Sequence, residues 1–230
     1  LRGELPASGA IAARAPRWEQ GVFGTSYGLD GNAESTLDLG QAVTFDREMP
    51  FSVSAWVRPD SEGAIFSKID DGAAFRGVDT FVTGNGELVT HLINTWENNA
   101  IKVVTDKALA MGVWSHVAVT YDGSSKAAGV AVYVNGTLVS TTVEKDSLSG
   151  PLETAEPFRL GQRSASLYLK GAIAGVQFFD QALPGDAIAT GVEDALASAL
   201  PETLGEEQAM ALRKYAEQKV ALATKPQQEA

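Results

Sequence analysis

The stretch GVAVYVNGTLVS, residues 129–140, predicts a β-hairpin. Val130, Val132 and Val134 alternate with other residues, which is typical of a strand with one buried face. Asn135 and Gly136 follow, and a second β-rich run begins directly after them. An Asn-Gly pair accepts the positive φ angles of a type I′ turn, whose twist matches that of the flanking strands. The hairpin therefore indicates antiparallel sheet structure in this part of the chain.

Similar short runs recur on both sides of this hairpin, from Phe51 onward, and Gly, Asp and Asn residues separate them. They are not interleaved with long helical patterns, which disfavours a parallel βαβ arrangement. We therefore predict an all-β fold with two antiparallel sheets packed as a sandwich. The ten candidate strands are FSVSAWV, AIFSKI, TFVT, ELVTHLINTW, AIKVVT, WSHVAVTYD, GVAVYV, TLVSTTV, PFRLG and YLKGAIAGVQFF.

Composition changes after Leu183-Pro184, where Ala, Glu, Gln and Lys become frequent. This pattern predicts a short helix within residues 186–200 and a longer one within 201–224. We expect residues 1–184 to form the sandwich domain and residues 185–230 to form a helical C-terminal extension or linker. Such a tail either docks on its own sandwich or leads to a following domain.

The charge balance restricts the partners. Among 230 residues the formal net charge is -11, so nucleic acid phosphates and anionic membrane surfaces are repelled, and we expect no nucleic acid partner. No apolar run reaches the roughly 20 residues that span a bilayer, so we expect no direct membrane insertion.

The absence of cysteine excludes disulfides and thiolate chemistry. Hydrophobic residues make up 44% of the chain, which supports a buried core.

The sequence offers little for catalysis. His91 and His116 lie in separate predicted strands without metal-ligand spacing, and neither accompanies a G-x-S-x-G nucleophile motif. None of the strong strand runs carries the closely alternating Glu and Asp residues that would place a glycosidase acid and nucleophile on one face. We therefore expect that this protein is not an enzyme. A glycoside hydrolase stays a remote alternative, because catalytic carboxylates need not be close in sequence.

Aromatic and amide side chains gather in HLINTWENNAIKV, residues 91–103. A ring for stacking beside hydrogen-bonding amides is what a sugar site requires. We therefore predict a ligand site here. Two structural alternatives weigh equally, since strand tryptophans usually fill cores and an Asn-Asn pair often forms a turn. The predicted ligand-binding residues are His91, Asn94, Trp96, Asn98 and Asn99.

Oxygen-rich turns at residues 29–35 (LDGNAES) and 68–72 (KIDDG) suggest candidate calcium ligands, and Asp30 is the better of them. Neither segment has EF-hand spacing. Asp and Asn are also the usual turn formers, so a plain turn is favoured for each segment.

Five segments together resemble the laminin G-like, concanavalin A-like jelly-roll domains. In family order they are YGLDGNAESTLDLG, PFSVSAWVRPD, AIFSKID, GVWSHVAVTYDGSSKAAGVAVYVNGTLV and LYLKGAIAGVQFFDQALPGDAI. The segment FRGVDTFVTGNGELVTHLINTWENNAIKVVT is similar to a version embedded in large exported bacterial proteins with cytochrome c-like segments. No C-x-x-C-H motif occurs here, so no haem attaches to this chain.

The resemblance implies a two-sheet jelly-roll sandwich, recognition of carbohydrate or protein, and often one calcium ion. The acidic calcium ligand that the family carries in a G-x-I-D motif is replaced here, because Gly171, Ala172 and Ile173 are followed by Ala174. Asp30 with backbone carbonyls is then the remaining calcium candidate. The resemblance also implies a periplasmic or cell-surface location.

These observations favour a noncatalytic module that binds polysaccharide or another glycan within a larger exported protein. The alternative is an architectural or protein-docking domain that orients neighbouring domains and has no sugar ligand.

Overall fold

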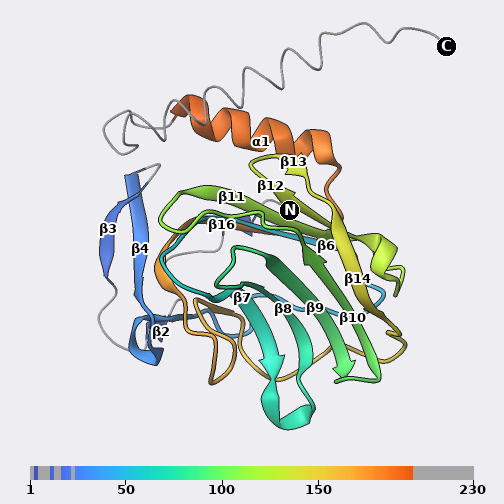
Figure 1. Cartoon of the computed structure of the whole chain (residues 1–230). Helices are drawn as coiled ribbons and strands as arrows, with labels where there is room; N and C mark the ends of the chain where they lie inside the picture. Colours follow the sequence, from blue (N-terminus) through green and yellow to red (C-terminus); the bar gives the residue numbers. More distant parts are fainter. Residues whose placement is uncertain (1–2, 5–10, 13–16, 22–23, 199–230) are drawn as a thin grey trace, which may run out of the picture.

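The computed structural model describes residues 3–4, 11–12, 17–21 and 24–198, which fold into two antiparallel sheets packed face to face (Figure 1). Sheet A has the strand order β13-β12-β11-β6-β16-β4-β3, with β1 paired to β16. Sheet B has the order β14-β10-β9-β8-β7-β15-β5-β2. The predicted all-β, two-sheet jelly-roll sandwich is therefore confirmed.

The strands of sheet A are β1 (Gly3–Glu4), β3 (Trp18–Gly21), β4 (Gly24–Asp30), β6 (Phe51–Pro59), β11 (Ser115–Tyr121), β12 (Val130–Val134), β13 (Thr137–Leu138) and β16 (Lys170–Phe179). Those of sheet B are β2 (Ile11–Ala12), β5 (Leu37–Asp38), β7 (Gly63–Asp70), β8 (Arg76–Val82), β9 (Leu88–Thr95), β10 (Asn99–Thr105), β14 (Thr141–Asp146) and β15 (Arg159–Leu160). The turns η1 (Ala33–Ser35), η2 (Asp71–Ala73) and η3 (Ala127–Gly129) are short 3₁₀ helices.

The core lies between the sheets, and β6 shows how the pleat fills it. Val53 and Val57 of β6 point inward and belong to the large central cluster. Ser54 and Trp56 alternate with them and point to the outer face of sheet A. They are nevertheless buried, at 7% and 3% exposed, because a further layer covers that face. Each sheet of this sandwich therefore has a buried inner face and, in part, a covered outer face.

The predicted Asn135–Gly136 hairpin is confirmed. It joins β12 to β13 with φ angles of 49° and 79°, both positive as a type I′ turn requires. The Asn135 side-chain oxygen also accepts a hydrogen bond from the His116 backbone N–H at 2.8 Å, which ties the turn to β11. After β13 the chain leaves sheet A and continues as β14 at the edge of sheet B.

The layer over sheet A is helix α1 (Gly185–Ser198), which Figure 1 shows on the side of sheet A away from sheet B. Ile188 packs in a cluster with Ala118 and Tyr133, and Val192 packs in another with Trp56. The predicted short helix is thus present, and it docks on the sandwich. The longer helix predicted within residues 201–224 lies outside the described residues, and the domain boundary at residue 184 stays a prediction. None of the described helices is long and apolar enough to cross a membrane.

Gly171 of β16 is required by the close approach of β6. Its φ is +143°, and a Cβ placed on it would lie 2.0 Å from the Arg58 carbonyl oxygen. We expect Gly171→Ala to lower the free energy of unfolding by about 2–4 kcal/mol, because the two central strands would have to separate. Urea denaturation measures this. The matched control is Gly191→Ala in α1, where nothing lies within 4 Å and stability should rise by up to about 1 kcal/mol. Equal effects of the two changes would contradict the close approach.

His116 of β11 lies on the outer face of sheet A and is 8% exposed. Burial lowers the pKa of its imidazole from 6.5 to about 4, so the ring stays neutral in the folded protein. As pH falls from about 6.5 towards 4, the His116 imidazole binds a proton in the unfolded chain but stays neutral in the folded chain. The free energy of unfolding therefore decreases. Between pH 7 and pH 4.5 we expect this ring to account for about 2 kcal/mol of lost stability. Denaturation of the wild type and of His116→Gln at both pH values measures the difference, and parallel pH profiles would contradict it.

Candidate functional site

Polar side chains form a line across the outer face of sheet B. Each member is the Cα partner of the next across six antiparallel strands, so their side chains share one face. That face is the outer one, because the intervening residues Val78, Leu92 and Ile101 belong to the central core. We call this line the polar row. From β5 to β10 its members are Asp38, Arg159, Ser67, Asp79, His91 and Lys102.

A charged network occupies the middle of the polar row. Asp79 is fully buried, and its Oδ1 accepts a hydrogen bond from His91 Nδ1 at 2.9 Å. The guanidinium of Arg163, from the segment between β15 and β16, forms an ion pair with the other carboxylate oxygen. Arg163 Nη2 also lies 3.1 Å from His91 Nδ1. The network therefore ties the 161–169 segment onto the face of the sheet.

Two neighbouring side chains decide the charge of Asp79. Burial on its own raises the pKa of a carboxyl, but His91 and Arg163 outweigh it and hold the pKa of Asp79 below the usual 3.8. The carboxylate is therefore ionised at neutral pH and available only as a hydrogen-bond acceptor. His91 Nε2 is buried and has no hydrogen-bond partner among the described residues.

Three half-buried aromatic rings surround this network, and we call them the aromatic rim: Phe75, Phe81 and Trp96. Trp96 meets the His91 ring edge-on with centroids 5.2 Å apart, and Phe81 lies 5.8 Å from the same ring. The Arg163 guanidinium lies over Phe75 at 5.7 Å and over Phe81 at 5.4 Å. The rim thus places apolar ring surface beside charged and hydrogen-bonding groups on the outer face of sheet B.

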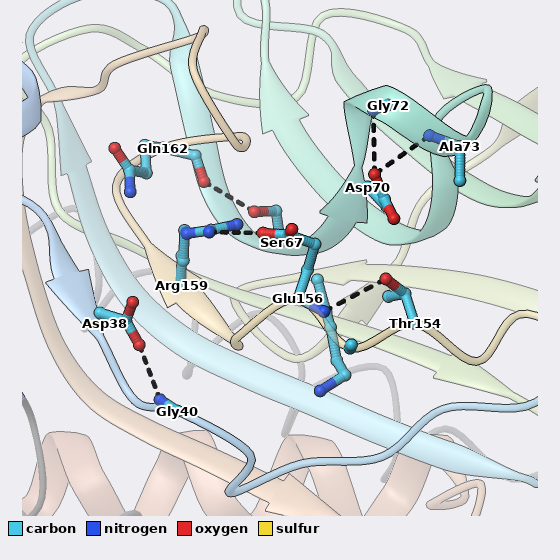
Figure 2. A network of polar contacts seen from close by, with 12 residues as sticks. Asp38, Gly40, Ser67, Asp70, Gly72, Ala73, Thr154, Glu156, Arg159 and Gln162 are labelled. Atoms are coloured by element: carbon cyan, nitrogen blue, oxygen red, sulfur yellow. Dashed lines mark hydrogen bonds and ion pairs between the residues drawn. The ribbon is translucent and has the colours of Figure 1, made fainter.

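The β5 end of the polar row is braced by residues in the loops next to β5 and β15, as Figure 2 shows. Arg159 donates to Glu156 Oε2 at 2.6 Å, and the Ser67 hydroxyl donates to the Gln162 carbonyl at 2.8 Å. Asp38 Oδ1 accepts the backbone N–H of Gly40 at 2.8 Å. These contacts fix the β5 end of the polar row on its scaffold.

Two of the sequence-predicted ligand residues come together here, since His91 belongs to the polar row and Trp96 to the aromatic rim. Asn98 is exposed in the turn between β9 and β10. Asn94 Nδ2 donates to the Pro151 carbonyl at 2.8 Å, and Asn99 Oδ1 accepts the Ser149 N–H at 2.7 Å. Both amides therefore fasten the 149–151 segment beside the hairpin. A contact between any of these residues and a sugar stays a prediction.

Asp30 lies apart from this surface, at the end of β4 in sheet A. Its carboxylate forms an ion pair with the guanidinium of Arg17, and its backbone N–H donates to Ser35 Oγ at 2.8 Å. Arg17 would compete with a cation for this carboxylate, and the calcium role that the sequence suggested for Asp30 stays a prediction. In the described part of the chain, no three His, Cys, Asp or Glu side chains gather where they could hold a metal ion.

The sequence interpretation missed Asp79, Phe75, Phe81 and Arg163. Asp79 had a visible signal, because a carboxylate in the middle of the strand pattern VDTFV must find a partner or lie on an open face. Arg163 had none. It stands in the irregular segment GQRSAS, 84 residues from Asp79 in the chain, and only the fold brings the two together.

Removing Arg163 leaves a buried carboxylate short of its main counter-charge. We expect Arg163→Met to lower the free energy of unfolding by about 3–5 kcal/mol, since the methionine keeps much of the volume and none of the charge. Adding Asp79→Asn should recover a large part of this loss. Urea unfolding of both single variants and the double variant at pH 7 tests the coupling, and additive effects would contradict a direct buried ion pair.

Comparison with solved structures finds the same fold in two toxin domains. The binding domain of Paraclostridial Mosquitocidal Protein 1 aligns with a TM-score of 0.63 and 14% identity, covering 81% of this chain and 47% of that one. The binding domain of the Botulinum Neurotoxin serotype G aligns with a TM-score of 0.61 and 14% identity, covering 82% of this chain and 46% of that one. This chain therefore spans less than half the length of either.

No curated protein sequence matches this chain. A family model does, over residues 30–189, which include every strand from β5 to β16 and the start of α1. The chain belongs to the concanavalin A-like lectin/glucanases superfamily.

Proposed function

We propose that this domain is a noncatalytic recognition module that binds glycan on the outer face of sheet B. The observation that carries the proposal is the aromatic rim around the Asp79–His91–Arg163 network. A sugar ring presents apolar C–H surface that packs on aromatic rings, and hydroxyl groups that need charged or polar partners. Trp96 and Phe81 supply the first, and Arg163 with the neighbouring Lys102 supplies the second.

The carboxylate of the network argues for recognition rather than hydrolysis. Glycosidases need one carboxylic acid that donates a proton and a second carboxylate on the other side of the scissile bond. Asp79 is fully buried and held ionised, so it neither reaches a substrate nor carries the proton. Its role in the proposal is to hold Arg163 and His91 in place.

The family and the solved relatives support a binding role. The name of the family includes lectins as well as glucanases, and both toxin relatives are named as binding domains. Exposure of the domain to glycans implies export to the periplasm or cell surface as part of a longer protein, as the sequence resemblance indicated. An architectural domain, the alternative function, would have the same fold but would make no use of the aromatic rim.

Glycan-array binding of the purified chain tests the proposal, followed by titration of the best glycan. We expect Trp96→Leu to weaken binding by at least about tenfold, because it removes the stacking ring but keeps apolar contact with Ile93 and Ala100. The matched control is Trp18→Leu on β3, whose side chain is 54% exposed and belongs to sheet A. Melting temperatures of both variants confirm that they are folded.

Two results would overturn the proposal. If the wild type binds no glycan on the array, the architectural alternative takes its place. If Trp18→Leu and Trp96→Leu weaken binding equally, the glycan does not sit at the aromatic rim.

A further inference from the structure

A cavity lies on the opposite side of the molecule from the aromatic rim, between α1 and the outer face of sheet A. Its volume is about 540 Å³, within the range of small-molecule sites. We call it the α1 pocket. Strands β6, β11 and β16 form its floor, and α1 forms its wall. Its lining residues include Ser54, Trp56, His116, Gln177, Gly191 and Asp194.

The cavity exists because small residues face each other across the helix–sheet contact. Ala187, Gly191 and Ala195 recur every fourth residue along α1 and all line the pocket. The sheet opposes them with small residues such as Ser54 and Ala118. Larger side chains of the helix pack on the sheet at Ile188, Val192 and Leu196. A packed interface would fill this space, since protein interiors reach the density of organic crystals.

The floor of the pocket contains a buried histidine with an unused hydrogen-bonding atom. His116 Nδ1 is buried and has no hydrogen-bond partner among the described residues. The Trp56 ring lies against it at a centroid distance of 5.4 Å and an angle of 64°. A buried polar atom left without a partner costs free energy, typically about 1–3 kcal/mol. A ligand that reaches this atom would recover that cost.

The lining also selects the charge of a ligand. Neither lysine nor arginine lines the pocket within the described ranges, and the ionisable groups present are Asp194 and the neutral His116. A phosphate or carboxylate would therefore find no counter-charge. Ser54, Gln177 and His116 offer hydrogen bonds to an uncharged ligand, and Trp56 offers an apolar surface.

We propose that the α1 pocket binds a small uncharged ring compound that bears hydroxyl groups, of the size of a monosaccharide. The site is separate from the glycan surface on sheet B and does not rest on it, because the two lie on the outer faces of different sheets. The pocket is a hollow with the volume of a small-molecule site, whereas the aromatic rim offers an open surface.

The imidazole nitrogens give a direct readout in the intact chain. With only two histidines in the sequence, the ¹⁵N signals of His116 are identified by comparison with His116→Gln. Glucose, galactose, mannose and N-acetylglucosamine are titrated separately, and inorganic phosphate serves as the charged control. We expect at least one of the sugars to shift the His116 signals and phosphate to leave them unchanged.

Gly191→Leu is the variant that closes the pocket. Gly191 lines the pocket, and a Cβ placed on it would have no atom within 4 Å. A leucine there therefore has room to start into the cavity, and it also improves helix propensity. It should weaken sugar binding by at least about tenfold. Thr190→Leu is the matched control, since Thr190 is exposed and does not line the pocket, and it should bind as the wild type does. Trp96→Leu should also leave the His116 shifts unchanged.

Each contrary result overturns the inference. If no sugar shifts the His116 signals, the pocket holds only water or another part of the chain. If phosphate shifts them instead, the ligand chemistry is wrong. If binding persists in Gly191→Leu, the sugar sits elsewhere.

Discussion

The buried carboxylate of Asp79 is the constraint on which the outer face of sheet B depends. A charge without access to water must be neutralised by groups fixed at short range. Asp79 finds these groups on different segments, with His91 on the neighbouring strand and Arg163 on the segment between β15 and β16. Arg163 in turn lies over Phe75 and Phe81, so one ion pair positions part of the aromatic rim as well as the loop. The geometry of the proposed glycan surface is thus a consequence of satisfying one charge.

Both outer faces of the sandwich are covered in part, but in different ways. Sheet A is covered by α1, which contacts it through Ile188 and Val192. A cavity remains between the helix and the sheet. Sheet B is covered by loop side chains that pack on a polar row. A covered outer face explains why β6 is buried at nearly every residue instead of alternating between buried and exposed. It also explains why polar side chains such as Ser54 and His116 are found at depth without being part of the core.

The fold was largely predictable because its signals are local. Alternating valines before Asn135-Gly136 determine a hairpin through turn geometry and side-chain periodicity alone, and the Ala-rich run after Pro184 determines a helix in the same way. The site was only partly predictable. Trp96 and His91 were chosen for their chemistry, and they do lie together. Asn94 and Asn99 were chosen for the same chemistry, but their amides bond the 149–151 segment, which no pattern within residues 91–103 indicates.

Some residues escaped prediction because their meaning depends on register. Asp79 and Lys102 are ordinary strand residues until antiparallel pairing places them on either side of His91 on a single face. A shift of one residue in any strand would turn its side chain into the core and break the polar row. The inward-facing valines and leucines that prevent such a shift are therefore also what assembles the proposed binding surface. In this fold, core packing and site construction are the same constraint acting on opposite faces of sheet B.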